Sequence, residues 1–126
     1  MKLYNIIAFN DFYLQNSDKQ MNIKTSYALN NILVKCNTDI EFYNNELQKI
    51  FDDCVEKTED GKYKMTDDDE NFIVKTNKIN EFEERYNDLR QLDINDLSDN
   101  DKIDLELLED LNISPAQLLQ IQGFIK

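Results

Sequence analysis

Residues 26–55 read SYALNNILVKCNTDIEFYNNELQKIFDDCV, and this stretch decides the fold expected for the chain. It contains neither glycine nor proline, and its apolar residues recur at alternating steps of four and three. Such spacing places them on one face of an α-helix. We therefore expect one long helix from about Ile23 to Glu56, roughly 50 Å in length. The residues on its apolar face are Leu29, Leu33, Cys36, Ile40, Tyr43, Leu47, Ile50 and Cys54.

A hairpin and a second helix are expected after the long helix. Residues 62–65 and 71–75 are typical of two short strands, and the charged residues 67–70 would connect them. Helical spacing returns in residues 77–91, which we expect to pack antiparallel against the long helix. The apolar residues of this second helix are Ile79, Phe82, Tyr86 and Leu89.

The two ends of the chain complete the expected architecture. Residues 3–13 are apolar and aromatic enough for one or two strands, and the alternation in residues 102–107 predicts a half-buried strand. Ser114-Pro115-Ala116-Gln117 is typical of a helix start with a capping box. We predict a single domain over residues 1–126 of class α+β: a long antiparallel helical hairpin with a small antiparallel sheet or β-hairpin and a short C-terminal helix.

The composition excludes several classes of function. The chain has 126 residues, a net charge of −12 and no histidine. Without histidine there is no Ser-His or Cys-His catalysis and almost no route to catalytic zinc, and two glycines cannot build a phosphate-binding loop. The negative charge disfavours direct binding to nucleic acid and to anionic membranes. We predict no enzymatic activity, no catalytic residues, no metal and no cofactor.

Residues 67–71 and the two cysteines were the remaining candidates for chemistry. Residues 67–71 resemble the start of a calcium-binding EF-hand loop, but Phe72 and Lys78 stand where that loop needs glycine and glutamate. Cys36 and Cys54 both fall on the apolar face of the long helix. They are expected to be buried, free thiols, with an intermolecular bridge as the alternative.

More than half of the excess negative charge lies in residues 92–113. This segment holds eight carboxylates and one lysine, a net charge of −7. It is either a solvated face or a docking surface for a partner with a basic surface. Tyr63, on the expected hairpin, is a further candidate because tyrosine is favoured at interface hot spots. The candidate partner-binding carboxylates are Asp93, Asp96, Asp99, Asp101, Asp104 and Glu106.

Four short motifs occur in a characteristic order along the chain. They are MKLYN at 1–5, IKTSY at 23–27, EKTEDGKY at 56–63 and LNISPA at 111–116. In this order they resemble a family of small, uncharacterised proteins encoded by bacteriophages and prophages of Firmicutes and gut bacteria. The resemblance implies a viral protein made inside an infected bacterium, and it carries no catalytic residues over to this chain.

The expected function is therefore protein–protein interaction. One role is the inhibition of a host defence or nucleic-acid enzyme in the host bacterial cytoplasm, where the carboxylates would meet a basic groove. The alternative is a virion assembly or accessory protein that forms a homo-oligomer through the long helix. The chain lacks an apolar run long enough for a membrane span and lacks a secretory signal, so it is expected to stay where it is made.

Overall fold

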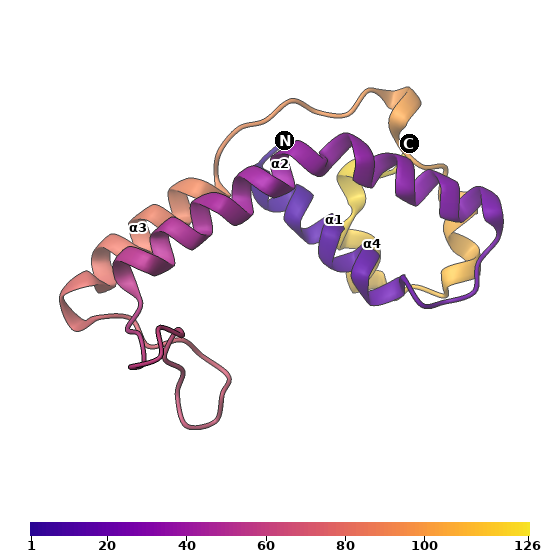
Figure 1. Cartoon of the computed structure of the whole chain (residues 1–126). Coiled ribbons are helices and arrows are strands. Elements are labelled where there is room, and N and C mark those ends of the chain that lie inside the picture. Colours follow the sequence, from indigo (N-terminus) through magenta and orange to yellow (C-terminus); the bar gives the residue numbers. More distant parts are fainter. The chain divides into compact units, whose positions relative to one another are not determined.

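The computed structural model describes all 126 residues and shows a mainly helical chain (Figure 1). Helical segments hold 63% of the residues and no β-strand is formed, so the predicted α+β class is wrong. The α-helices are α1 (Leu3–Asn16), α2 (Ile23–Cys54), α3 (Ile79–Arg90) and α4 (Pro115–Gln120). The 3-10 helices are η1 (Thr76–Lys78), η2 (Asp99–Asp101), η3 (Leu105–Leu111) and η4 (Gln122–Phe124).

Two compact units make up the structure. Unit 1 contains residues Met1–Glu41 and Leu92–Lys126, and unit 2 contains Phe42–Gln91. Helix α2 therefore contributes its first part to unit 1 and its last part to unit 2. The single domain expected for residues 1–126 stays a prediction. None of the helices is both long enough and apolar enough to span a bilayer.

Helix α2 confirms the long helix expected from the heptad-like spacing. Its observed limits, Ile23 and Cys54, lie within two residues of those expected. Five of the eight residues on the apolar face are buried and the other three are half-buried. The long helix therefore packs its apolar face within the chain.

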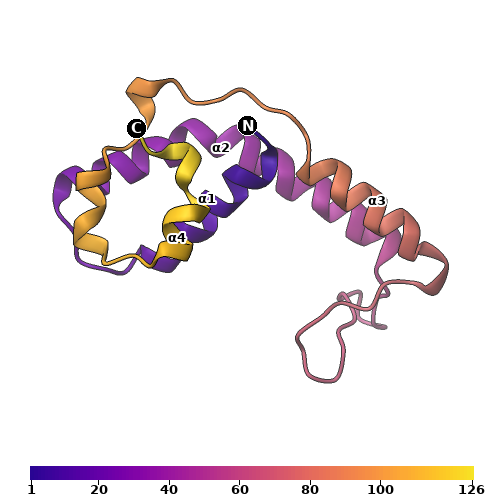
Figure 2. The same ribbon diagram turned by 180° about the vertical axis from the view of Figure 1, so that it is seen from behind.

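Helix α1 replaces the strands expected near the N-terminus. Leu3, Ile6, Phe9 and Phe12 recur every third residue, and all four are buried on one side of the helix. Richness in aromatic and β-branched residues suits a strand, but a helix places these four side chains on the side that the rest of the chain buries, and that burial decided the local structure. Helix α4 lies beside α1, and the Gln120 side chain donates a hydrogen bond to the backbone oxygen of Ala8 at 2.8 Å (Figures 1 and 2).

The core of unit 1 forms where α1, α2 and the C-terminal segment meet. The Phe9 and Phe124 ring centroids are 4.7 Å apart, and the Phe9 and Phe12 centroids are 6.3 Å apart. Residues from three distant parts of the sequence thus bury a common set of side chains. The buried residues of this core are Ile6, Phe9, Phe12, Leu29, Ile32, Cys36, Ile103, Leu108, Leu111, Ile121 and Phe124.

The strand expected over residues 102–107 is also wrong. Only Ile103 makes a bridge, to Ile125 in the parallel sense, and η3 begins two residues later. Leu108 and Leu111 are the buried residues of η3, and their spacing of three matches the three residues per turn of a 3-10 helix. The burial of Leu108 and Leu111 therefore overrides the alternation seen before them.

The expected hairpin is reduced to isolated bridges. Met65 bridges Phe72, as the hairpin prediction requires, but Lys57 also bridges Tyr63 and Val55 bridges Val74. Three short segments thus each pair with the other two at single positions. Two backbone hydrogen bonds surround each bridge, and no pair continues to a second bridge, so no strand or antiparallel sheet forms.

Helix α4 confirms the helix start expected at Ser114. The Ser114 hydroxyl accepts a hydrogen bond from the Gln117 backbone N–H at 3.2 Å, and the Gln117 side chain accepts one from the Ser114 N–H at 3.0 Å. Replacing Ser114 with alanine should lower the free energy of unfolding by about 1 kcal/mol, because an N–H of the first turn loses its acceptor. Urea unfolding followed by circular dichroism measures this loss.

Ser98→Ala is the control for that prediction. The Ser98 hydroxyl makes no cap to a helix N–H, and it donates its hydrogen bond to the half-buried Asp101 at 2.9 Å. We expect a change within about 0.5 kcal/mol for this variant. Equal losses in the two variants would show that the capping box contributes nothing specific.

Candidate functional site

The carboxylates of residues 92–113 follow the outside of unit 1. We call these eight residues the acidic block. Seven of them are exposed and Asp101 is half-buried. The acidic block therefore faces solvent, whether or not it also meets a partner. Its members are Asp93, Asp96, Asp99, Asp101, Asp104, Glu106, Glu109 and Asp110.

Two carboxylates at the start of the acidic block are paired with cations near the N-terminus. Asp93 lies 2.7 Å from the Lys2 ammonium, and Asp96 lies 2.6 Å from the amino group of Met1. Hydrogen bonds from these cations hold the pKa of both carboxyl groups below the ordinary range. Their stabilising contribution is therefore present at neutral pH and lost as the pH falls into the acid range.

The rest of the acidic block is neutralised only in part. Asp99 lies 3.5 Å from Lys102, and Asp104 lies 3.6 Å from Lys126. Glu106 is exposed and forms no ion pair. Ion pairs this exposed contribute little to stability, so a partner's cation can replace the internal one at small cost.

Hydrogen bonds join the end of the acidic block to residues at the start of α2 and just before it. Asp110 accepts a hydrogen bond from the Asn22 backbone N–H at 3.0 Å, and the Thr25 hydroxyl donates to the Leu107 backbone oxygen at 2.6 Å. The Lys19 ammonium donates to the Leu111 backbone oxygen at 3.1 Å. These bonds hold η3 in one position, and with it Asp104 and Glu106.

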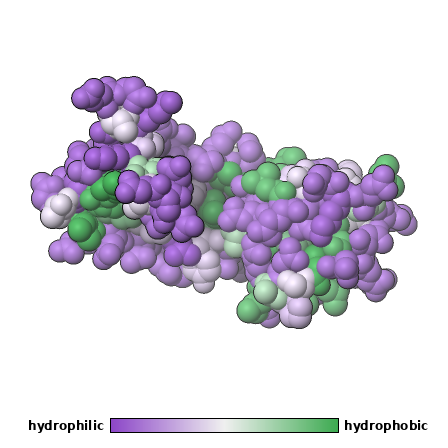
Figure 3. Space-filling model, turned by 90° about the horizontal axis from the view of Figure 1, so that it is seen from below, coloured by the Kyte–Doolittle hydropathy of each residue, from purple (hydrophilic) through white to green (hydrophobic).

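An apolar hollow lies between Leu105 of η3 and the C-terminal segment, and its only charged lining residue is Lys126. Leu105, which follows Asp104 and precedes Glu106 in the sequence, is 54% exposed, and Leu119 of α4 is 71% exposed. The hollow has a volume of about 520 Å³. We name it the apolar hollow; the residues that line it are Leu105, Pro115, Leu118, Leu119, Gln122, Ile125 and Lys126. In the face drawn in Figure 3, hydrophobic side chains likewise reach the surface in separate patches among hydrophilic ones.

A second hollow, of about 440 Å³, lies between the start of α2 and residues 100–107. Exposed Ile23 and Tyr27 line it on the α2 side. Its charged lining is mixed, with three lysines and two aspartates: Lys24, Lys102, Lys126, Asp101 and Asp104. This hollow therefore has no strong preference for a partner of either charge.

Tyr63 lies in unit 2, in a cluster of half-exposed aromatic rings. Its ring contacts Phe51 edge-on, with centroids 5.4 Å apart, and its hydroxyl donates to Asp52 at 2.5 Å. This hydrogen bond raises the pKa of Tyr63 and lowers that of Asp52. Tyr63 is thus held in place by its neighbours, with part of its surface open to solvent. The aromatic cluster contains Phe51, Tyr63, Phe72, Phe82 and Tyr86.

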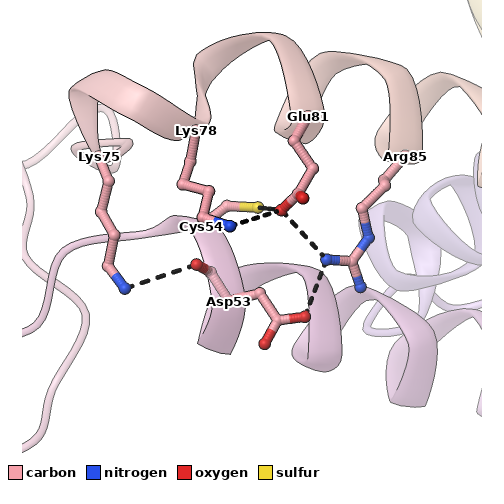
Figure 4. Close-up of polar contacts among 6 residues, drawn as sticks. All are labelled: Asp53, Cys54, Lys75, Lys78, Glu81 and Arg85. Atoms are coloured by element: carbon pink, nitrogen blue, oxygen red, sulfur yellow. Dashed lines mark hydrogen bonds and ion pairs between the residues drawn. The ribbon is translucent and has the colours of Figure 1, made fainter.

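A polar network joins α3 to the end of α2 in unit 2 (Figure 4). Arg85 lies 2.8 Å from Asp53 and 3.6 Å from Glu81, and Glu81 accepts a hydrogen bond from the Cys54 thiol at 3.2 Å. Burial and the Glu81 carboxylate raise the pKa of Cys54, so its thiol stays protonated. A buried, protonated thiol is a poor nucleophile, and the network is therefore structural.

Cys36 is the other free thiol, buried in unit 1. Burial, with a smaller effect of the Asp39 carboxylate, raises the pKa of Cys36 to about 11. An unfolded chain releases this proton near pH 8.5. Between those two values the folded state binds more protons, so stability should fall by about 1.4 kcal/mol per pH unit from this group.

The difference between the wild type and Cys36→Ala isolates that contribution. Urea unfolding at pH 8 and pH 10.5 should show a smaller loss of stability for the variant, because its other titrating groups are unchanged. Parallel losses in the two proteins would contradict the raised pKa of Cys36.

No group of three or more cysteine, aspartate or glutamate side chains is arranged to hold a metal ion. No protein-family model matches the chain, and no curated protein or solved structure matches it. The resemblance to phage-encoded proteins stays a prediction.

Sequence reasoning found the acidic block but missed the apolar hollow. Of the apolar residues in the strand expected over residues 102–107 and in the C-terminal helix, Ile103, Ile121 and Phe124 are buried, whereas Leu105, Leu118 and Leu119 are exposed. The adjacent leucines 118 and 119 could have indicated an exposed apolar side chain, because a six-residue helix buries only one narrow face.

Proposed function

We propose that this protein acts by binding another protein and that unit 1 makes the contact through the acidic block. One observation carries the proposal: seven of the eight carboxylates of the acidic block are exposed on unit 1, and the exposed Leu105 lies among them, between Asp104 and Glu106 in the sequence. Apolar anchors surrounded by charged groups are the arrangement found at protein interfaces. Carboxylates around such an anchor favour a partner with a basic surface and speed its association.

The partner we propose is a nucleic-acid or defence enzyme of a bacterial host. Such enzymes carry basic grooves, and a surface of exposed carboxylates competes for those grooves with the phosphates of nucleic acid. The proposal combines the charge of the acidic block with the resemblance to phage-encoded proteins, and it places the protein in the cytoplasm of an infected bacterium.

A virion assembly or accessory role is the second candidate. It is favoured by the outer face of α2 in unit 1, where Ile23, Tyr27 and Val34 are exposed at steps of four and seven. Residues at these steps lie on one side of a helix and can meet a second copy of the chain. A protein that stays monomeric at high concentration and is absent from purified particles would exclude this role.

Affinity capture during phage infection of a Firmicute host tests the proposal. The tagged wild type is compared with a block-neutral variant, in which the six candidate carboxylates of the acidic block are changed to their amides. A matched control neutralises six exposed carboxylates of unit 2: Glu59, Asp67, Glu70, Glu83, Glu84 and Asp88. Circular dichroism establishes that both variants are folded.

We expect a basic host protein to be captured by the wild type and by the control, and to be lost with the block-neutral variant. Equal loss with both variants would show that only net charge matters. Capture that is unchanged by the block-neutral variant would overturn the proposal. Recovery of capsid or tail proteins would favour the assembly role.

A further inference from the structure

We propose that unit 2 binds the phosphate group of a small molecule in a hollow lined by three lysines. The hollow has a volume of about 460 Å³, and its lining comes entirely from unit 2. We name it the lysine hollow; its lining residues are Glu56, Lys57, Lys64, Lys75, Thr76 and Asn77. The proposal goes beyond protein binding by unit 1 and does not depend on it.

Backbone hydrogen bonds bring the three lysines together from separate segments of the chain. The Glu56 N–H donates to the Ile73 oxygen at 2.8 Å, and the Ile73 N–H donates to the Lys64 oxygen at 2.9 Å. The Lys64 N–H donates to the Glu56 oxygen at 2.7 Å, which closes a ring of three bonds. The Lys75 N–H adds a bond to the Cys54 oxygen at 2.8 Å. The backbone of the site is therefore in place before any ligand binds.

The lysine ammonium groups are only partly neutralised within the chain. Lys64 forms no ion pair and no side-chain hydrogen bond. The Lys75 ammonium donates to the Asp53 backbone oxygen at 3.5 Å, whereas the Asp53 carboxylate faces Arg85 at 2.8 Å (Figure 4). Only Lys57 pairs with a carboxylate, at 3.1 Å. Two of the three ammonium groups are therefore available to an anion.

The other lining residues contribute one carboxylate and further hydrogen-bond donors. Glu56 is the only acidic residue of the lining, and it forms no ion pair with the three lysines. The side chains of Thr76 and Asn77 are exposed and make no hydrogen bond within the chain. The lining therefore carries a net charge of +2 and also offers a hydroxyl and an amide donor.

These groups match a phosphate monoester. Such a group carries a charge of about −1.5 to −2 at neutral pH and presents several strong acceptor oxygens, and lysine binds it as a point charge. A carboxylate brings one charge and two oxygens, so it would leave part of the lining unpaired. The volume of the lysine hollow lies within the range of small-molecule sites and leaves room for the rest of the ligand.

The charge outside the lining favours a small ligand over nucleic acid. Unit 2 carries fourteen carboxylates and eight basic side chains, a net charge of −6. A nucleic-acid strand would have to run past these carboxylates, and their repulsion of its successive phosphates opposes binding. A single phosphate group meets only the lining of the hollow.

The second hollow, in unit 1, does not offer the same site. It also has three lysines, but two aspartates share its lining. Lys102 and Lys126 pair with carboxylates at 3.5 and 3.6 Å. Its cations are therefore neutralised to a greater extent than those of the lysine hollow.

An NMR titration at neutral pH and constant ionic strength tests the proposal. The probe is glycerol 3-phosphate, and the comparison ligands are acetate and a short oligothymidylate. The proteins are the wild type, K64Q, K64Q/K75Q and the matched control K49Q/K62Q, which removes two lysines of unit 2 outside the hollow. Amide shifts locate the bound ligand, and circular dichroism establishes that each variant is folded. Because Lys64 is exposed, K64Q provides a test even if the double variant fails to fold.

We expect glycerol 3-phosphate to shift amides of residues 56–77 and to bind the wild type and K49Q/K62Q with similar Kd values. The Kd should be at least about threefold higher for K64Q and about tenfold higher for K64Q/K75Q, because these variants remove the free ammonium groups. Acetate should bind the wild type at least about tenfold more weakly than the phosphate ester.

Three results would overturn the proposal. The first is an equal Kd for the wild type and K64Q/K75Q, or amide shifts confined to unit 1. The second is an equal loss of affinity in K49Q/K62Q, which would show that only net charge matters. The third is tighter binding of the oligothymidylate, which would assign the lysine hollow to nucleic acid. None of these results bears on the acidic block, which lies in unit 1.

Discussion

Phe9→Ala should lower the free energy of unfolding by about 3–5 kcal/mol, the largest effect expected of any single change in unit 1. Phe9 is fully buried and its ring packs between those of Phe12 and Phe124. Alanine would leave a cavity that three segments of the chain surround, and the ring contacts would be lost as well. Urea unfolding monitored by circular dichroism and by the tyrosine signal measures the change.

The control is Leu14→Ala on the same helix. Leu14 is 60% exposed, so its truncation should change stability by no more than about 0.5 kcal/mol. A small effect of Phe9→Ala would mean that α1 does not pack as described. Residue-resolved hydrogen exchange adds a second result: if residues 1–126 form a single domain, amides of unit 2 should lose protection together with those of unit 1.

Phe51→Ala should have the largest effect in unit 2, a loss of about 2–3 kcal/mol. The Phe51 ring is half-buried and contacts three other rings, those of Tyr63, Phe72 and Phe82, at centroid distances of 5.4, 4.9 and 5.7 Å. The expected loss is below that of a fully buried phenylalanine because part of the ring already meets solvent. The bridges around residues 55–75 should lose hydrogen-exchange protection first.

Phe42→Ala is the matched control for this prediction. Phe42 lies on the same helix and in the same unit, but it is 43% exposed and has no ring contact of this kind. We expect a loss below about 1 kcal/mol. Equal losses in the two variants would show that the aromatic cluster does not hold unit 2 together.

The charge of the candidate site could be predicted from the sequence, but the pairing of its carboxylates could not. The excess of carboxylates in residues 92–113 is a property of the sequence alone, and the structure leaves seven of the eight exposed. Three of their four cation partners are not local, since the Met1 amino group and Lys2 lie at one end of the chain and Lys126 at the other, whereas Lys102 is only three residues from Asp99. Which carboxylate keeps a free charge therefore depended on tertiary contacts. Glu106 emerged as a free acceptor only after the other pairs were known.

Some helices were likewise determined by the local sequence, and others by tertiary contacts. Residues 26–55 determined α2 by themselves. Over so long a stretch without glycine or proline, only an α-helix places residues at this heptad-like spacing on one face. The capping box at Ser114 determined the start of α4 for an equally local reason, since its hydrogen bonds span only three residues. Only the tertiary structure decided α1, the bridges of residues 55–75 and η3. Short apolar segments suit a strand or a helix, and the surface available for their burial selects between the two. The exposure of Leu118 and Leu119 followed from that selection, because Ile121 and Phe124 had already filled the core.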